Sequence, residues 1–181
     1  TNLAISLSIR RDLGILKRLR GTPLPTWGLM AGIIGSAIIF AALLTAVTIV
    51  VGVVFYDVSV PGRWLGLVLD IVVGVACFSA LGLAVSTFIP NADAAPAITN
   101  GVLLPLIFIS GTFFPIDPSS FISHLADVFP VRHFILTVFS AFDPNASSAG
   151  FIGRDLLVMA AWGVGGVLVG LRRFRWESRR T

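Results

Sequence analysis

The most basic segment before the long apolar runs extends from Ser8 to Pro25 and reads SIRRDLGILKRLRGTPLP. Its large aliphatic side chains recur at the spacing of one helical face: Ile9, Leu13, Leu16 and Leu19. Arg11 and Arg18 fall on the other side of such a helix. A short basic amphipathic helix lies in the plane of a membrane surface, with its apolar face toward lipid or toward transmembrane helices. Pro23 and Pro25 end it, because proline lacks a backbone N–H and restricts the residue before it.

The composition indicates an all-α, polytopic integral membrane protein. Of its 181 residues, 56% are hydrophobic and only 12% are charged, whereas soluble domains have about 25% charged residues. The net charge of +4 comes from basic residues that flank apolar runs, which indicates membrane orientation and argues against a nucleic-acid partner. The single cysteine, Cys77, excludes a disulfide framework and a cysteine metal cluster.

Four apolar stretches are each predicted to form a full transmembrane helix within a single membrane domain, residues 1–181. These stretches are residues 27–56, 64–89, 96–114 and 151–171. A kink is expected at Pro105 in the third. In the fourth, Gly166 and Gly170 are four residues apart and predict a face for close helix packing. Residues 1–9 resemble the end of a preceding span, so we expect the chain to be the C-terminal part of a longer protein.

Residues 115–142 predict a different structure, an outward-facing re-entrant hairpin before the last span. Prolines divide this segment into two apolar helices of about ten to twelve residues, which are too short to cross a bilayer. Non-helical backbone at membrane depth is tolerated where it packs against protein.

Orientation follows from the excess of basic residues on cytoplasmic loops. One side would carry ten: Arg10, Arg11, Lys17, Arg18, Arg20, Arg172, Arg173, Arg175, Arg179 and Arg180. The opposite side would carry Arg63, Arg132 and Arg154. The basic helix, the tail at residues 172–181 and the turn containing Asn91 and Asp93 are therefore predicted to be cytoplasmic, and Asp93 could cap the following helix.

Several polar or aromatic residues lie within or near the predicted spans. Asp70 lies about two turns from the end of its span; snorkelling, or pairing with Arg63 or another helix, is favoured over a role in a transport pathway. Thr99 and Asn100 could hydrogen-bond across helices. Phe113 and Phe114 could contact an amphiphilic substrate or serve in packing.

The sequence lacks the motifs of an enzyme with its own active site. It has no Gly-x-x-x-x-Gly-Lys loop, no His-Glu-x-x-His, no Cys-x-x-Cys and no Gly-x-Ser-x-Gly. His124 and Asp127 could be neighbours on a helix, but a polar pair is favoured over a metal site, which needs three or four ligands. No cofactor is therefore expected in this chain.

Three segments together resemble a known family. Residues 11–25 resemble the cytoplasmic segment of ABC-2 type exporter permeases of the daunorubicin-resistance and polysaccharide-export group. The turn PNADAAP at residues 90–96 is similar to the turn between that family's fourth and fifth spans. Residues 110–116 and 129–133 resemble the exit of its fifth span and its outer hairpin.

The resemblance implies a six-span permease, of which this chain would hold the end of the second span and all later ones. Residues 10–22 would then be the coupling helix, which docks on a separate ATP-binding subunit carrying ATP and magnesium. The implied coupling residues are Arg11, Asp12, Gly14, Lys17, Arg18, Arg20, Thr22, Pro23 and Pro25. A second permease half, identical or different, would complete the transporter, and the outer hairpin would close the exit side.

The function implied by the resemblance is export of a drug-like, lipid-like or glycan substrate across the cell membrane. The alternative is a membrane scaffold or assembly factor that transports nothing. An ion-coupled secondary transporter ranks last, because it needs a charge pair near the middle of the membrane and Asp70 is predicted to be shallow.

Overall fold

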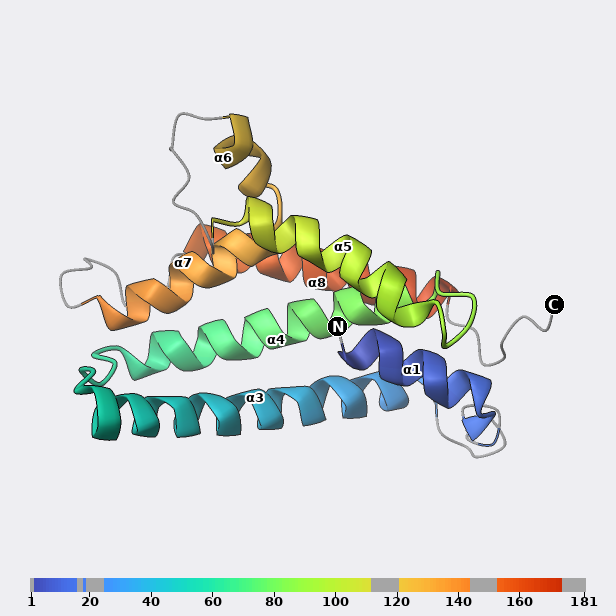
Figure 1. Cartoon of the computed structure of the whole chain (residues 1–181), viewed down its shortest axis with the longest axis horizontal. Helices are drawn as coiled ribbons and strands as arrows, with labels where there is room; N and C mark the ends of the chain where they lie inside the picture. Colours follow the sequence, from blue (N-terminus) through green and yellow to red (C-terminus); the bar gives the residue numbers. More distant parts are fainter. Residues whose placement is uncertain (1, 16–17, 19–24, 112–120, 144–152, 174–181) are drawn as a thin grey trace.

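The computed structural model describes residues 2–15, 18, 25–111, 121–143 and 153–173, and within these ranges it is helical without strands. The helices, with their bounds, are α1 (Asn2–Asp12), α3 (Thr26–Tyr56), α4 (Trp64–Ser86), α5 (Ala95–Ile109), α6 (Phe121–Ala126), α7 (Pro130–Phe142) and α8 (Gly153–Arg173). Helices α3, α4 and α8 run along the length of the molecule, α1 and α5 lie beside one half of it, and α7 lies beside the other (Figure 1).

Three helices are long and apolar enough to cross a membrane. They are Trp27–Tyr56 within α3, Trp64–Ser86 (α4) and Gly153–Arg173 (α8), so three of the four predicted stretches form long apolar helices that are candidate membrane spans, with bounds within a few residues of those predicted. The fourth, predicted at residues 96–114, is wrong as a full-length helix. Helix α5 has 15 residues, or about 22 Å, against a hydrocarbon core of about 30 Å. It ends before Gly111, whose φ of 83° is left-handed, and Phe113 and Phe114 lie outside the described residues.

Helix α4 is the centre of the packing, and its closest partner is α8. Glycines on one face of α8 let the two backbones approach. A Cβ atom added at Gly166 would lie 2.8 Å from the carbonyl carbon of Ala80, and one at Gly170 would lie 2.9 Å from the Leu83 side chain. The packing face predicted from Gly166 and Gly170 is therefore confirmed.

Helix α7 contacts both α4 and α8, and one of its contacts with α4 is an aromatic side chain. The ring of Phe134 lies directly against Gly74, where a Cβ would collide with it, and meets Phe78 edge to face at a centroid distance of 5.6 Å. The C-terminal end of α7 is bound by Arg63, which donates to the carbonyls of Ser140 (3.2 Å) and Asp143 (2.9 Å).

The bend between α6 and α7, residues 127–129, reaches the middle of α8. The indole N–H of Trp162 donates to the carbonyl of Val128 at 2.8 Å, and its ring stacks on Phe129. Trp162 is nine residues into α8, about 14 Å along its axis from Gly153. The bend therefore lies level with the middle of α8, with α7 beside the long helices and α6 projecting away from them (Figure 1).

The molecule has two distinct ends (Figure 1). At one end lie the C-termini of α1 and α8 and the α4–α5 turn (residues 87–94), where the guanidinium of Arg173 lies 5.3 Å from the ring centre of Phe88. At the other end lie the α3–α4 loop and the C-terminus of α7. Exposed arginines gather at the first end: Arg10, Arg18, Arg172 and Arg173.

Replacing Gly166 by Val should destabilise the protein, because the new side chain would overlap the backbone of α4. Overpacking of this kind costs about 1–3 kcal/mol or more. Gly165→Val is the matched control, since a Cβ at Gly165 meets nothing within 4 Å. Thermal unfolding in one detergent should show a lower midpoint for Gly166→Val only, and equal midpoints would contradict the packing described here.

Candidate functional site

Helix α1 is fixed to the bundle by one face, which its side chains share at helical spacing: Ala4, Leu7, Ser8 and Arg11, all buried. Ala4 packs with Ile89 and Ala95 near the α4–α5 turn. Leu7 packs with Leu83 of α4 and with Met30 of α3.

The face predicted to be apolar is not the packed one. Ile9 is 42% exposed and Leu13 is 67% exposed, so the interpretation that this face contacts transmembrane helices is wrong, while its contact with lipid stays a prediction. Leu16 and Leu19 lie outside the described residues. The packed face is less apolar because its last member, Arg11, satisfies backbone carbonyls, and helical periodicity does not detect such contacts.

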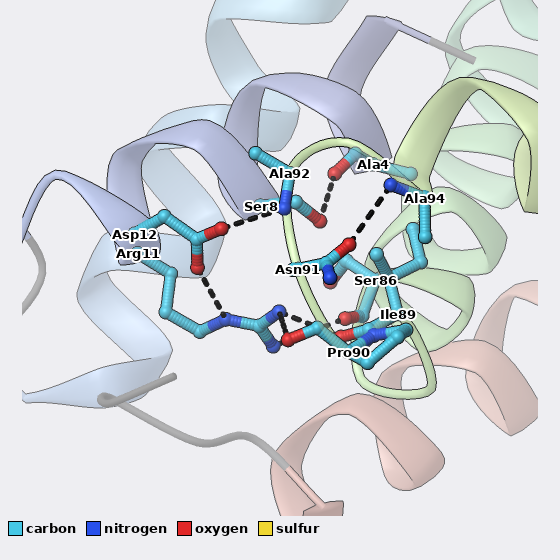
Figure 2. Close-up of polar contacts among 10 residues, drawn as sticks. All are labelled: Ala4, Ser8, Arg11, Asp12, Ser86, Ile89, Pro90, Asn91, Ala92 and Ala94. Carbon is cyan, nitrogen blue, oxygen red and sulfur yellow. Dashed lines mark hydrogen bonds and ion pairs between the residues drawn. The ribbon is translucent and has the colours of Figure 1, made fainter. Parts of the chain in front are cut away.

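Arg11 is only 7% exposed and binds the end of α4 (Figure 2). Its Nη2 donates to the carbonyl of Ile89 at 2.6 Å and to that of Pro90 at 3.3 Å, and its Nη1 donates to the carbonyl of Ser86 at 3.5 Å. Ser86 is the last residue of α4, where carbonyls lack intrahelical partners and form the negative end of the helix dipole, whereas Ile89 and Pro90 belong to the turn that follows. The guanidinium therefore satisfies carbonyls of both the helix end and the turn.

Asp12 binds the same turn from its other side. Its Oδ2 accepts from the backbone N–H of Ala92 at 2.6 Å, and its Oδ1 lies 3.9 Å from Nε of Arg11. Within the turn, Oδ1 of Asn91 accepts from the N–H of Ala94 at 2.9 Å (Figure 2). The expected cap by Asp93 is wrong: the N-cap residue of α5 is Ala94, and it makes no side-chain cap bond.

These contacts form one unit, the α1–turn junction, made by Arg11 and Asp12 with residues 86–94. The sequence predicted both halves separately, as a basic helix and as a cytoplasmic turn, and the structure brings them together. Exposed polar residues surround the unit: Arg10, Asp12, Arg18, Asn91 and Asp93.

The predicted continuous helix over residues 10–22 is wrong in its first half. Helix α1 runs without a break from Asn2 to Asp12, and Gly14 then adopts a left-handed φ of 70°, which glycine tolerates at a helix end. A new turn begins there, because the N–H of Arg18 bonds the carbonyl of Gly14 at 3.2 Å. Pro25 is exposed at the N-cap of α3, and Lys17, Arg20, Thr22 and Pro23 lie outside the described residues.

The polar residues of the spans are placed differently from expectation. Asp70 is fully buried and does not snorkel, and among the described residues neither of its carboxyl oxygens has a hydrogen-bond partner, Arg63 included. Arg63 bonds the end of α7. The hydroxyl of Thr99 bonds Ala95 of its own helix at 2.6 Å, and Asn100 is exposed, so no bond across helices is seen for either among the described residues.

A buried pair between a histidine of α7 and an aspartate of α8 was not predicted from the sequence. Nδ1 of His133 lies 2.7 Å from Oδ1 of Asp155, and Nε2 lies 2.7 Å from the carbonyl of Asp127. The carboxylate of Asp127 instead binds Arg132 at 2.9 Å. His133 and Asp155 are 22 residues apart on different helices, so no local spacing could signal their contact. In the described part of the chain, no three His, Cys, Asp or Glu side chains group to hold a metal ion.

Removing the carboxylate of Asp12 should loosen the α4–α5 turn. We expect the amide of Ala92 to exchange its hydrogen about fivefold faster in Asp12→Ala, equal to about 1 kcal/mol for one exposed charge-assisted bond. Asp93→Ala is the control, because Asp93 makes no cap bond. Hydrogen-exchange mass spectrometry over residues 87–95, corrected for intrinsic rates, tests this. Equal protection of Ala92 in both variants would contradict it.

A family model described as ABC-2 type transporter matches residues 1–142, which is most of the chain and includes the whole α1–turn junction. Searches of curated proteins and of solved structures gave no match. Membrane domains of this family typically lack an ATPase site, normally bind no cofactor themselves and generally pair with ATP-binding subunits. With its three long apolar helices, this chain belongs to the ABC-2 type transporter family, as a multi-pass membrane component.

Proposed function

We propose that this chain is the membrane-spanning subunit of an ATP-driven exporter, and that a separate ATP-binding subunit docks at the α1–turn junction. The observation that carries the proposal is the double attachment of α1 to the α4–α5 turn through Arg11 and Asp12. Membership of the family supports it, because such membrane domains generally pair with ATP-binding subunits.

The junction is suited to transmit a displacement. Arg11 holds carbonyls at the end of α4, and Asp12 holds an amide just before α5, so a partner that moves α1 pulls both helices together. Helix α4 in turn packs on α8 and α7, where close backbone contacts resist sliding. Movement of such packed elements as rigid bodies is a common way for switching proteins to change state.

The uneven distribution of exposed arginines between the two ends supports an orientation for this subunit in the membrane. The end that carries the junction also carries exposed Arg10, Arg172 and Arg173, and excess basic residues favour the cytoplasmic side. We therefore place the junction and the C-terminus of α8 in the cytoplasm and the α3–α4 loop outside the cell membrane. In this orientation α6 and α7 form a re-entrant hairpin that enters from the outer side.

The substrate proposed from the family resemblance is a drug-like, lipid-like or glycan molecule. Helix α3 exposes large apolar side chains along its length, among them Ile39 (71%) and Phe40 (66%), which suits contact with lipid or with a second permease half. We propose that two halves, identical or different, enclose the path of the substrate.

Reversing the charge of Arg18 should weaken docking of the ATP-binding subunit. Arg18 is exposed near the junction, and Arg154→Glu is the matched control because Arg154 is exposed on the first turn of α8, at the other end. Co-purification from membranes should recover about tenfold less partner with Arg18→Glu, alone or combined with Lys17→Glu and Arg20→Glu, and normal amounts with Arg154→Glu. Undiminished recovery with the triple variant would refute docking at this site.

A second variant separates docking from transmission. Arg11→Ala removes the bonds to α4 but leaves the exposed surface charges in place, since Arg11 is buried. We expect it to retain the ATP-binding subunit while lowering substrate-stimulated ATP turnover about tenfold in reconstituted vesicles. Normal substrate-stimulated ATP turnover in Arg11→Ala would contradict transmission through the junction. If the parent protein binds the ATP-binding subunit but no substrate stimulates ATP turnover, the result would favour a membrane scaffold.

A further inference from the structure

The side chain of Asp70 is an unpartnered carboxyl group inside the bundle. Its exposure is 0%, and among the described residues neither of its oxygens has a hydrogen-bond partner. It lies six residues into α4, about 9 Å along the axis from Trp64. Burying an isolated carboxylate costs far more free energy than packing around it returns, so its negative charge has to be neutralised by a cation or a proton.

Two side chains from other helices face this carboxyl group: Thr137 of α7 and Asp155 of α8. Thr137 is also fully buried, and its hydroxyl donates to the carbonyls of His133 and Phe134, each at 3.0 Å. Because the hydroxyl hydrogen is used in this way, the lone pairs of Thr137 Oγ1 remain free to accept. While its hydroxyl hydrogen points to these carbonyls, Thr137 offers Asp70 an acceptor and not a donor.

The neighbouring ion pair does not supply the missing charge. His133 and Asp155 are joined at 2.7 Å, and the second ring nitrogen of His133 faces the carbonyl of Asp127. A charged His133 would be neutralised by Asp155 and a neutral His133 carries no charge, so the pair has no excess positive charge to offer Asp70. Asp70 is then one negative charge in excess.

The described positively charged side chains on the surrounding helices bind other groups or are exposed. Arg63 bonds the end of α7, Arg132 binds Asp127, and Arg154 is exposed. Arg11 of α1 bonds the far end of α4, and α3 has no charged residue between Thr26 and Tyr56.

We propose that Asp70 is a proton-binding site at the junction of α4, α7 and α8. The bound proton converts the carboxylate into a carboxylic acid, whose O–H donates to Oγ1 of Thr137. One proton thus meets both needs of the site, neutral charge and a donor toward Thr137. A metal cation would require several more oxygen ligands.

The site links the protonation of Asp70 to the seating of α7. Release of the proton would place a second anion facing Asp155 and remove the bond to Thr137, so α7 would be held less firmly against α4. Retention of the proton keeps the three helices joined. This inference does not depend on the docking of an ATP-binding subunit.

Infrared difference spectroscopy of the purified protein in lipid vesicles tests the proposal. Spectra in neutral and in strongly alkaline buffer are compared for the parent protein, Asp70→Asn and Asp57→Asn. The parent should show the carbonyl band of a protonated carboxylic acid at neutral pH, which shifts in heavy water. The band should be lost in Asp70→Asn, whose amide has the size of the protonated acid. It should persist in Asp57→Asn, because Asp57 is exposed and asparagine tolerates its left-handed φ of 57°.

Thr137→Val provides a second readout that does not require Asp70→Asn to fold. Valine keeps the shape of threonine but removes the acceptor, so the acid band should move to the frequency of a non-bonded carbonyl. A parent spectrum without an acid band, a band unchanged in Asp70→Asn, or a band unmoved in Thr137→Val would each overturn the proposal. So would a carboxylate signal that changes when sodium is replaced by a bulky organic cation at constant pH, because a metal ion would then neutralise the site.

Discussion

The fold depends on satisfying the backbone where α4 ends and the chain reverses into α5. Helix ends leave carbonyls and amides without intrahelical partners, and near a membrane each unsatisfied group is costly. Here Arg11 supplies donors to the carbonyls of Ser86, Ile89 and Pro90, and Asp12 supplies an acceptor to the amide of Ala92. A helix from the start of the chain is thereby fastened to a turn 80 residues later.

Helix α4 connects that contact to the rest of the molecule, because other helices pack along its length. Its cytoplasm-facing end, in the proposed orientation, is held by α1, its second half by the glycine face of α8, and its middle by Phe134 of α7. The buried Asp70 lies in the first half of α4, near the pair His133–Asp155 that fixes α7 to α8. One helix thus connects the surface proposed to receive a partner with the hairpin proposed to face outward.

Two interpretations failed because local patterns do not report tertiary contacts. Apolar periodicity grouped Ile9 and Leu13 on a face directed toward lipid or toward transmembrane helices, yet the face packed on those helices contains Arg11, which binds carbonyls at and beyond the end of α4. The depth of Asp70 in its span suggested snorkelling, yet its side chain points inward because α7 enters the bundle beside it. In each case the deciding partner came from a segment at least 65 residues away.

Hydropathy by itself determined the class, three of the spans and their bounds, because a continuous apolar run of twenty or more residues has few stable alternatives to a transmembrane helix. Local motifs also located both halves of the candidate site, the Arg11–Asp12 stretch and the turn at Asn91. Only the tertiary structure joined those halves, shortened the helix at residues 95–109, and paired His133 with Asp155. These features depend on which helices pack side by side, and that choice is made by glycine contacts and buried polar groups that are specified across the whole chain and not within any one segment.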